Sequence, residues 1–193
     1  MIHFDKTNRQ ILTSACLQCN DDCFQPPSKE VPKVGCCSYS PTFYLLEIKN
    51  MVQTNEVFFQ EYFLNHPAAL IEPYSIKIPA IIHPMYNSRP IQQGLTKLEQ
   101  DDLRQSYSIC QFFKTNHGCT LDPSYKNSVC RSFICLSIED DLTDKRQKNL
   151  LSWTKEIKTE ELNFQKTHEK VLRDLNIHLQ SNPTAVVQYL QSI

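Results

Sequence analysis

The chain has 193 residues, of which 40% are hydrophobic and 21% are charged, and its formal net charge is -1. This composition excludes a disordered or fibrous protein, and the balanced charge argues against general binding to nucleic-acid phosphates. A chain of this length forms one domain, or one domain with a helical appendage, and its core is large enough to fold without covalent staples.

The first forty residues predict a helix followed by an irregular loop. Residues 7–23 fit a helix with Thr13 or Ser14 as a cap, and the polar start lacks the apolar core of a secretory signal. Prolines and a glycine in residues 24–41 predict the loop. Five of the nine cysteines lie in this part of the chain: Cys16, Cys19, Cys23, Cys36 and Cys37.

Residues 38–109 contain no cysteine. Residues 44–52 and 56–65 carry apolar side chains at helical spacing, which predicts two core helices. Pro79 demotes the partly alternating residues 74–82 to an edge strand or a turn. We therefore expect a largely helical spacer, which ends with a short helix over 96–104.

A second group of four cysteines follows the spacer: Cys110, Cys119, Cys130 and Cys135. Residues 106–113 alternate as a strand does, and a turn at 115–118 leads into a returning segment, which predicts a small hairpin. Pro123 is suited to begin a helix that runs through Cys130. Cys130 and Cys135 would then be roughly 140° apart around the helix. Either the helix ends near Arg131, or these two thiols serve different atoms.

The charge density rises sharply in residues 139–180. Seventeen of these 42 residues are charged, and Leu150, Trp153 and Ile157 form one of two apolar stripes. This pattern predicts a long amphipathic helix or a helical pair with a solvated outer face. Pro183 follows its end and precedes a last short helix.

These elements predict a mainly α fold with one small β-hairpin. We expect an irregular, cysteine-rich, metal-binding lobe plus a C-terminal helical segment. The cysteine-cluster domain would span residues 1–136, with ligand segments at 14–37 and 106–136 and the helical spacer between them. Residues 137–193 would form a charged amphipathic helical tail packed on it.

The cysteine pattern predicts a metal site. No apolar run is long enough to cross a membrane, so the expected compartment is the cytoplasm. In a reducing compartment, clustered thiols favour metal ligation over disulfides. Cys16, Cys19 and Cys23 are spaced i, i+3 and i+7 and would share one face of a helix. All nine cysteines are candidate ligands: Cys16, Cys19, Cys23, Cys36, Cys37, Cys110, Cys119, Cys130 and Cys135.

Several alternatives remain open at this level. Adjacent residues such as Cys36 and Cys37 point to opposite sides of an extended chain, so one of them completes a first site while the other faces a second site or is spare. His117 is a substitute ligand, although a surface loop histidine is the more common case. Four thiolates suit a structural zinc ion and a [4Fe–4S] cluster equally, and spacing does not separate the two.

The second group of cysteines resembles the YkgJ-like cysteine-cluster family. The resemblance rests on Gly118-Cys-Thr-Leu-Asp-Pro followed by Cys130-Arg-Ser-Phe-Ile-Cys135, with Cys110 shortly upstream. The opening Cys16-x-x-Cys19 and the Cys36-Cys37 pair are similar to the first half of the family pattern. This family is described as a zinc- or iron-chelating domain and includes the flagellin lysine N-methylases.

The function expected from the sequence is therefore metal binding, in which clustered cysteines chelate zinc or an iron–sulfur cluster. The resemblance also implies an alternative, a protein lysine N-methylase-like enzyme that uses the cluster and acts on a protein substrate or partner. A thiol redox protein is a further alternative, because Cys16-x-x-Cys19 has redox spacing. No nucleic-acid or membrane partner is expected.

Overall fold

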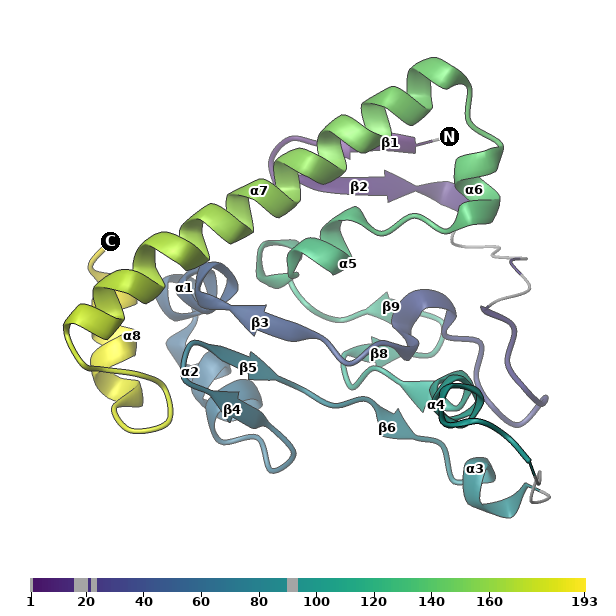
Figure 1. Cartoon of the computed structure of the whole chain (residues 1–193), viewed down its shortest axis with the longest axis horizontal. Helices are drawn as coiled ribbons and strands as arrows, with labels where there is room; N and C mark the ends of the chain where they lie inside the picture. Colours follow the sequence, from purple (N-terminus) through teal and green to yellow (C-terminus); the bar gives the residue numbers. More distant parts are fainter. Residues whose placement is uncertain (1, 16–20, 22–23, 90–93) are drawn as a thin grey trace. The chain divides into compact units, whose positions relative to one another are not determined.

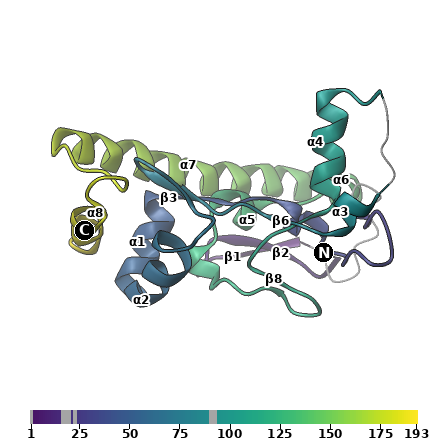
Figure 2. The same ribbon diagram turned by 90° about the horizontal axis from the view of Figure 1, so that it is seen from below.

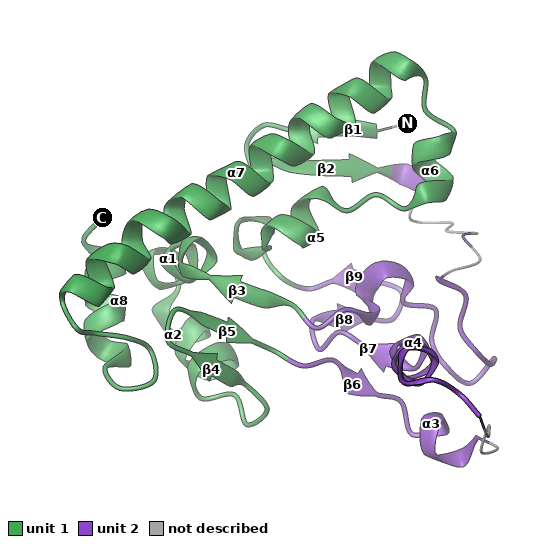
Figure 3. Ribbon diagram, in the orientation of Figure 1, with its two compact units in different colours: residues 1–13, 41–78, 121–193 green, residues 14–40, 79–120 purple. Residues whose placement is uncertain are grey.

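The computed structural model describes residues 2–15, 21, 24–89 and 94–193 (Figure 1). The chain divides into two compact units, which we describe separately (Figure 3). Unit 1 comprises residues 1–13, 41–78 and 121–193, and unit 2 comprises residues 14–40 and 79–120. Residues 121–136 thus share a unit with the charged C-terminal helices. The predicted boundary at residue 136 separates two domains, and a division into compact units does not test whether those domains fold independently.

Unit 1 begins with an antiparallel hairpin of β1 (Ile2–Asp5) and β2 (Gln10–Thr13). The helix predicted over residues 7–23 is therefore wrong at β2. A carboxylate oxygen of Asp5 accepts the amide of Thr7 at 2.9 Å, which starts a turn in place of a helix. Ile11 of β2 is then buried with Ile157 of a long helix, so tertiary packing overrides the local helical pattern.

A three-stranded antiparallel sheet with the order β3-β5-β4 follows in unit 1. Its strands are β3 (Thr42–Tyr44), β4 (Leu70–Glu72) and β5 (Ser75–Lys77). β5 pairs with both other strands, so it is the central strand and not the predicted edge. Pro79 permits this position because it lies two residues beyond the end of β5 and removes no ladder hydrogen bond. Ile76 of β5 pairs with Phe43 and Ile71, and it is completely buried.

The predicted spacer helices form the main core of unit 1. α1 (Leu45–Thr54) and α2 (Glu56–Phe59), which continues as a wide helical turn over Gln60–Leu64, confirm the predicted helical periodicity. α1 packs against α2, α7 (Asp144–Asp174) and α8 (Pro183–Gln191). Phe43 and Phe63 meet edge to face with their ring centroids 4.7 Å apart, a favoured aromatic geometry.

The long helix α7 (Asp144–Asp174) runs past α1, α5 (Ser128–Ser132) and β2 in both ribbon views (Figures 1 and 2). Its stripe of Leu150 and Ile157 is buried against the β1–β2 hairpin. Trp153 stacks on Phe4 with their centroids 5.5 Å apart. The short helix α6 (Leu136–Asp140) precedes α7. Of the two forms predicted for the charged segment, one long helix and not a helical pair is therefore observed over residues 144–174.

Unit 2 contains two small antiparallel pairs. β6 (Ile81–Ile82) pairs with β7 (Ser108–Ile109), and β8 (Phe113–Lys114) pairs with β9 (Gly118–Cys119), which confirms the predicted hairpin. The helices are α3 (Met85–Ser88) and α4 (Lys97–Ser106). Thr96 caps α4 in a capping box with Glu99, as a Thr followed three residues later by Glu predicts.

The predicted fold class needs two corrections. The strands of the described residues form four separate antiparallel sheets, so a mainly α fold with a single hairpin is wrong. The metal-binding lobe is also not supported, because no three described His, Cys, Asp or Glu side chains are arranged to hold a metal ion. The other three sheets escaped prediction because strands of two to four residues are too short to show a period. In the part of the chain that the structure describes, no helix is long and apolar enough to cross a bilayer.

Candidate functional site: a group of four thiols in unit 2

Backbone hydrogen bonds bring three cysteine-bearing segments of unit 2 together. Gly35 has a φ of 57° and begins a 3-10 turn, Gly35–Ser38, that carries Cys36 and Cys37. A residue with a side chain rarely adopts this φ, so glycine permits the sharp return of the chain after the proline-rich loop. The amide of Cys110 donates to the carbonyl of Cys37 at 2.7 Å. This bond joins the turn to the segment after β7, more than 70 residues later.

The β8–β9 hairpin brings Cys119 back toward Cys110. Cys119 pairs with Phe113, and the amide of Phe113 donates to the carbonyl of Cys110 at 2.9 Å. The amide of Thr120 closes the hairpin by donating to the carbonyl of Phe112 at 2.8 Å. The cysteines that flank the hairpin therefore lie on the same part of unit 2 as the Cys36–Cys37 turn.

The thiols are close enough to affect one another's ionisation. Contact with the Cys37 thiol, followed by burial of the sulfur, raises the pKa of Cys36 far above its ordinary value, although the residue itself is exposed. Burial raises the pKa of Cys110, and the charges of Cys119 and Cys36 raise it further, against the opposing amide of Phe112. Both thiols are protonated at neutral pH. Only a cation would allow this group to ionise together.

The cysteines of unit 1 lie in different surroundings. The helix predicted from Pro123 through Cys130 is wrong at its start, because a 3-10 turn at Pro123–Tyr125 is separate from α5. α5 ends at Ser132, which agrees with the alternative of a helix that ends near Arg131. The amide of Cys130 donates to the capping side chain of Asn127 at 2.8 Å. Cys135 is buried at the start of α6, and its Sγ lies 3.3 Å from Oγ of Ser137. Their role as ligands stays a prediction.

Four further residues were considered as ligands: Cys16, Cys19, Cys23 and His117. Cys16, Cys19 and Cys23 lie outside the described residues, so their predicted helical stripe stays a prediction. His117 is exposed in the β8–β9 turn, where its amide donates to the carbonyl of Lys114 at 3.0 Å. This is the ordinary position of a surface loop histidine.

A buried carboxylate pair in unit 1 escaped the sequence prediction. Glu47 of α1 is 1% exposed and Glu161 of α7 is 9% exposed. Glu161 accepts hydrogen bonds from the amide and hydroxyl of Ser128 at 2.8 and 2.7 Å. The guanidinium of Arg131 lies 3.7 Å from Glu47 and 3.1 Å from Glu160. These groups join α1, α5 and α7 in the interior, so their role is structural.

A signal for this pair exists in the sequence. Glu47 lies between Leu45 and Ile48 on the buried side of α1, and Glu161 follows Ile157 by one helical turn. An acid in line with an apolar stripe is expected to be buried and paired. The large number of charges in residues 139–180 hid this signal.

The pKa of Glu47 gives a testable pH dependence. Burial and the charge of Glu161 raise it well above its ordinary value, despite the amide of Tyr44 and the guanidinium of Arg131. A carboxyl with a raised pKa stabilises the fold fully below about pH 4.5, its unfolded value, and loses this contribution as the pH rises through the folded value. We expect the free energy of unfolding of Glu47→Gln to fall less as the pH rises, because the amide keeps the shape of the side chain and cannot ionise.

The measurement is the free energy of unfolding of both proteins in denaturant, from about pH 5 to about pH 8. The stability of the variant relative to the native chain should increase with pH. A difference that stays constant over this range would show that Glu47 does not titrate there.

Comparison with known proteins identifies no relative: no family description, no curated protein and no solved structure matches this chain. The resemblance to the YkgJ-like family therefore stays a prediction that rests on the quoted cysteine motifs.

Proposed function

We propose that this protein binds zinc or an iron–sulfur cluster through cysteine thiolates of unit 2. The observation that carries the proposal is that backbone hydrogen bonds bring the segments of Cys36, Cys37, Cys110 and Cys119 together in unit 2. The raised pKa values of the Cys36 and Cys110 thiols agree with this closeness. These thiols come from segments more than 70 residues apart, and the fold brings them within electrostatic range. Lone structural cysteines behave as small apolar side chains and are not grouped with thiols from distant segments.

The donor set suits a soft or borderline cation. Thiolates are the preferred ligands of zinc and of iron–sulfur clusters. No three of the described thiols are arranged to hold a metal ion by themselves. Ligands from Cys36, Cys37, Cys110 and Cys119 would therefore be completed by members of the group Cys16, Cys19 and Cys23, which lies in the sequence directly before the Cys36–Cys37 loop. A bound metal would favour the ionised thiols and release their protons. A reducing compartment such as the cytoplasm would keep these thiols available.

Metal analysis of the native chain tests this proposal. We expect anaerobically purified protein to carry stoichiometric zinc and no colour, or iron and sulfide with the brown absorption of a cluster. The double variant Cys36→Ser/Cys37→Ser should lose most of the metal, and so should Cys110→Ser. Native protein without zinc or iron, after reconstitution with each, would contradict the proposal.

Cys135→Ala is the matched control. Its thiol is buried beside Ser137 in unit 1, so we expect lower stability without loss of metal. Loss of the metal from this variant would instead place Cys135 in the ligand set, as the sequence pattern predicts.

A thiol redox function stays a prediction from the Cys16-x-x-Cys19 spacing, and the raised pKa of Cys36 does not support it, because redox-active thiols have a lowered pKa. Titration of free thiols separates the two functions. A metal protein should have fewer reactive thiols before metal removal than after it, whereas a redox protein should have the same number before and after. No observation on the described residues favours lysine N-methylation, which stays a prediction.

A further inference from the structure

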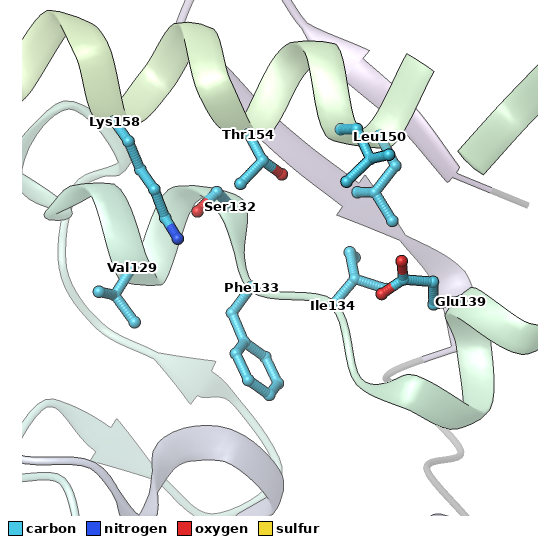
Figure 4. Close-up of a pocket in the computed structure, with 9 residues that line it drawn as sticks. Val129, Ser132, Phe133, Ile134, Glu139, Leu150, Thr154 and Lys158 are labelled. Atoms are coloured by element: carbon cyan, nitrogen blue, oxygen red, sulfur yellow. The ribbon is translucent and has the colours of Figure 1, made fainter. Parts of the chain in front are cut away.

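Unit 1 has a surface hollow of about 220 Å³ between α5 and α7. Figure 4 shows nine residues that line it. Leu150 of α7 and Ser132 of α5 are buried there, whereas Val129, Phe133 and Leu151 are 38%, 41% and 62% exposed. Single exposed apolar residues are normal on a protein surface, but several around one hollow mark a site of binding.

The two ends of the hollow carry opposite charges. Lys158 reaches down from α7 alongside Ser132, and Glu139 lies at the other end beside Ile134 (Figure 4). The Thr154 hydroxyl lies between them on α7. An occupant with one anionic group is therefore oriented, because its charge is attracted to Lys158 and repelled by Glu139.

Lys158 has no carboxylate partner among the described residues. Glu161, which follows Lys158 by three residues on α7, is buried, and Ser128 donates two hydrogen bonds to it. The Arg9 and Arg131 guanidinium groups take the other nearby acids of α7, Glu156 and Glu160. The ammonium group is thus available to an anion from outside the chain.

The size of the hollow limits what enters it. Pockets for drug-sized ligands usually measure about 300–1,000 Å³. A volume of about 220 Å³ suits a single ring or a short branched chain. We propose that this hollow binds a small carboxylate with one apolar group, the carboxylate at Lys158 and the apolar group against Leu150 and Phe133. This site is independent of the thiols of unit 2.

Titration of the full chain with 3-phenylpropionate, followed by amide chemical shifts in NMR spectra, tests the proposal. We expect saturable shifts at Ser132, Phe133 and Thr154. The neutral analogue 3-phenylpropan-1-ol should bind at least about fivefold more weakly, the usual scale for a partly exposed charge pair. Equal affinity for the alcohol, or shifts confined to other surfaces, would overturn the proposal.

Two variants on α7 complete the test. Lys158→Gln should lower the affinity for 3-phenylpropionate about fivefold and leave the affinity for the alcohol unchanged. Lys155→Gln, an exposed change on the same helix outside the hollow, should leave both affinities unchanged. Because both residues are exposed, neither substitution threatens the fold. Unchanged affinity in Lys158→Gln, or an equal loss in Lys155→Gln, would also overturn the proposal.

Discussion

Replacing Arg131 with Met should lower the free energy of unfolding of the chain by about 3–5 kcal/mol, the usual cost of removing one partner of a buried ion pair. The Arg131 side chain is 7% exposed, and its partner Glu47 is 1% exposed. Met fills much of the arginine volume but leaves Glu47 and Glu160 without their cation. Chemical denaturation measures the difference, with unfolding followed by the fluorescence of Trp153.

The matched control is Arg173→Met. Arg173 also pairs with a glutamate, Glu169, at 2.6 Å, but its side chain is 65% exposed. Exposed pairs one helical turn apart contribute about 0.3–0.5 kcal/mol, so this variant should be nearly as stable as the native chain. Similar losses in both variants would show that Arg131 acts through general packing and not through its buried charge.

A double variant separates charge from shape. The loss of stability in Arg131→Met is expected to arise because the buried carboxylate of Glu47 no longer has a cation beside it. If so, adding Glu47→Gln to this variant should recover part of the lost free energy of unfolding. The two residues are in contact, so their effects should not add. Additive losses would contradict the coupling between Glu47 and Arg131.

Metal removal is the second change with a large expected effect. Structural zinc contributes roughly 10–16 kcal/mol to small domains at neutral pH, whereas a whole domain is stable by only about 5–15 kcal/mol. If the proposed function is correct, a chelator should therefore unfold unit 2, where β6–β9 and the Cys36–Cys37 turn have few buried side chains. Thermal unfolding followed by circular dichroism, with and without chelator, measures this effect.

Unit 1 provides the internal comparison. None of the proposed ligands Cys36, Cys37, Cys110 and Cys119 lies in unit 1. The helices α1, α7 and α8 of its core should therefore persist after chelation. Identical melting curves for chelated and native protein that carries metal would show that the metal does not support the fold.

Local sequence was sufficient for the longer elements. α1 and α7 were predicted because apolar residues recur at helical spacing over two or more turns. The short helix predicted over 96–104 corresponds to α4, and the turn before Gly118 predicts the β8–β9 hairpin. In each case the signal lies within a few residues of the element that it specifies.

The candidate site was predicted only in part. The nine cysteines were visible as two groups, but their order in the chain did not show which of them share a unit. Cys110 and Cys119 lie in unit 2 with Cys36 and Cys37, whereas Cys130 and Cys135 lie in unit 1. This division depends on the Cys110 amide bond to Cys37 and on the packing of α5 against α7, both contacts between distant segments.

The amino-acid sequence by itself determined the long helices and the clustering of thiols, because helical periodicity acts over one or two turns. Only the tertiary structure decided that residues 10–13 are a strand, that Glu47 is buried beside Glu161, and that Lys158 is left without a carboxylate partner among the described residues. The physical reason is the same in each case. Burial and charge pairing depend on which distant segments meet, and their energies exceed the small local preferences of the chain.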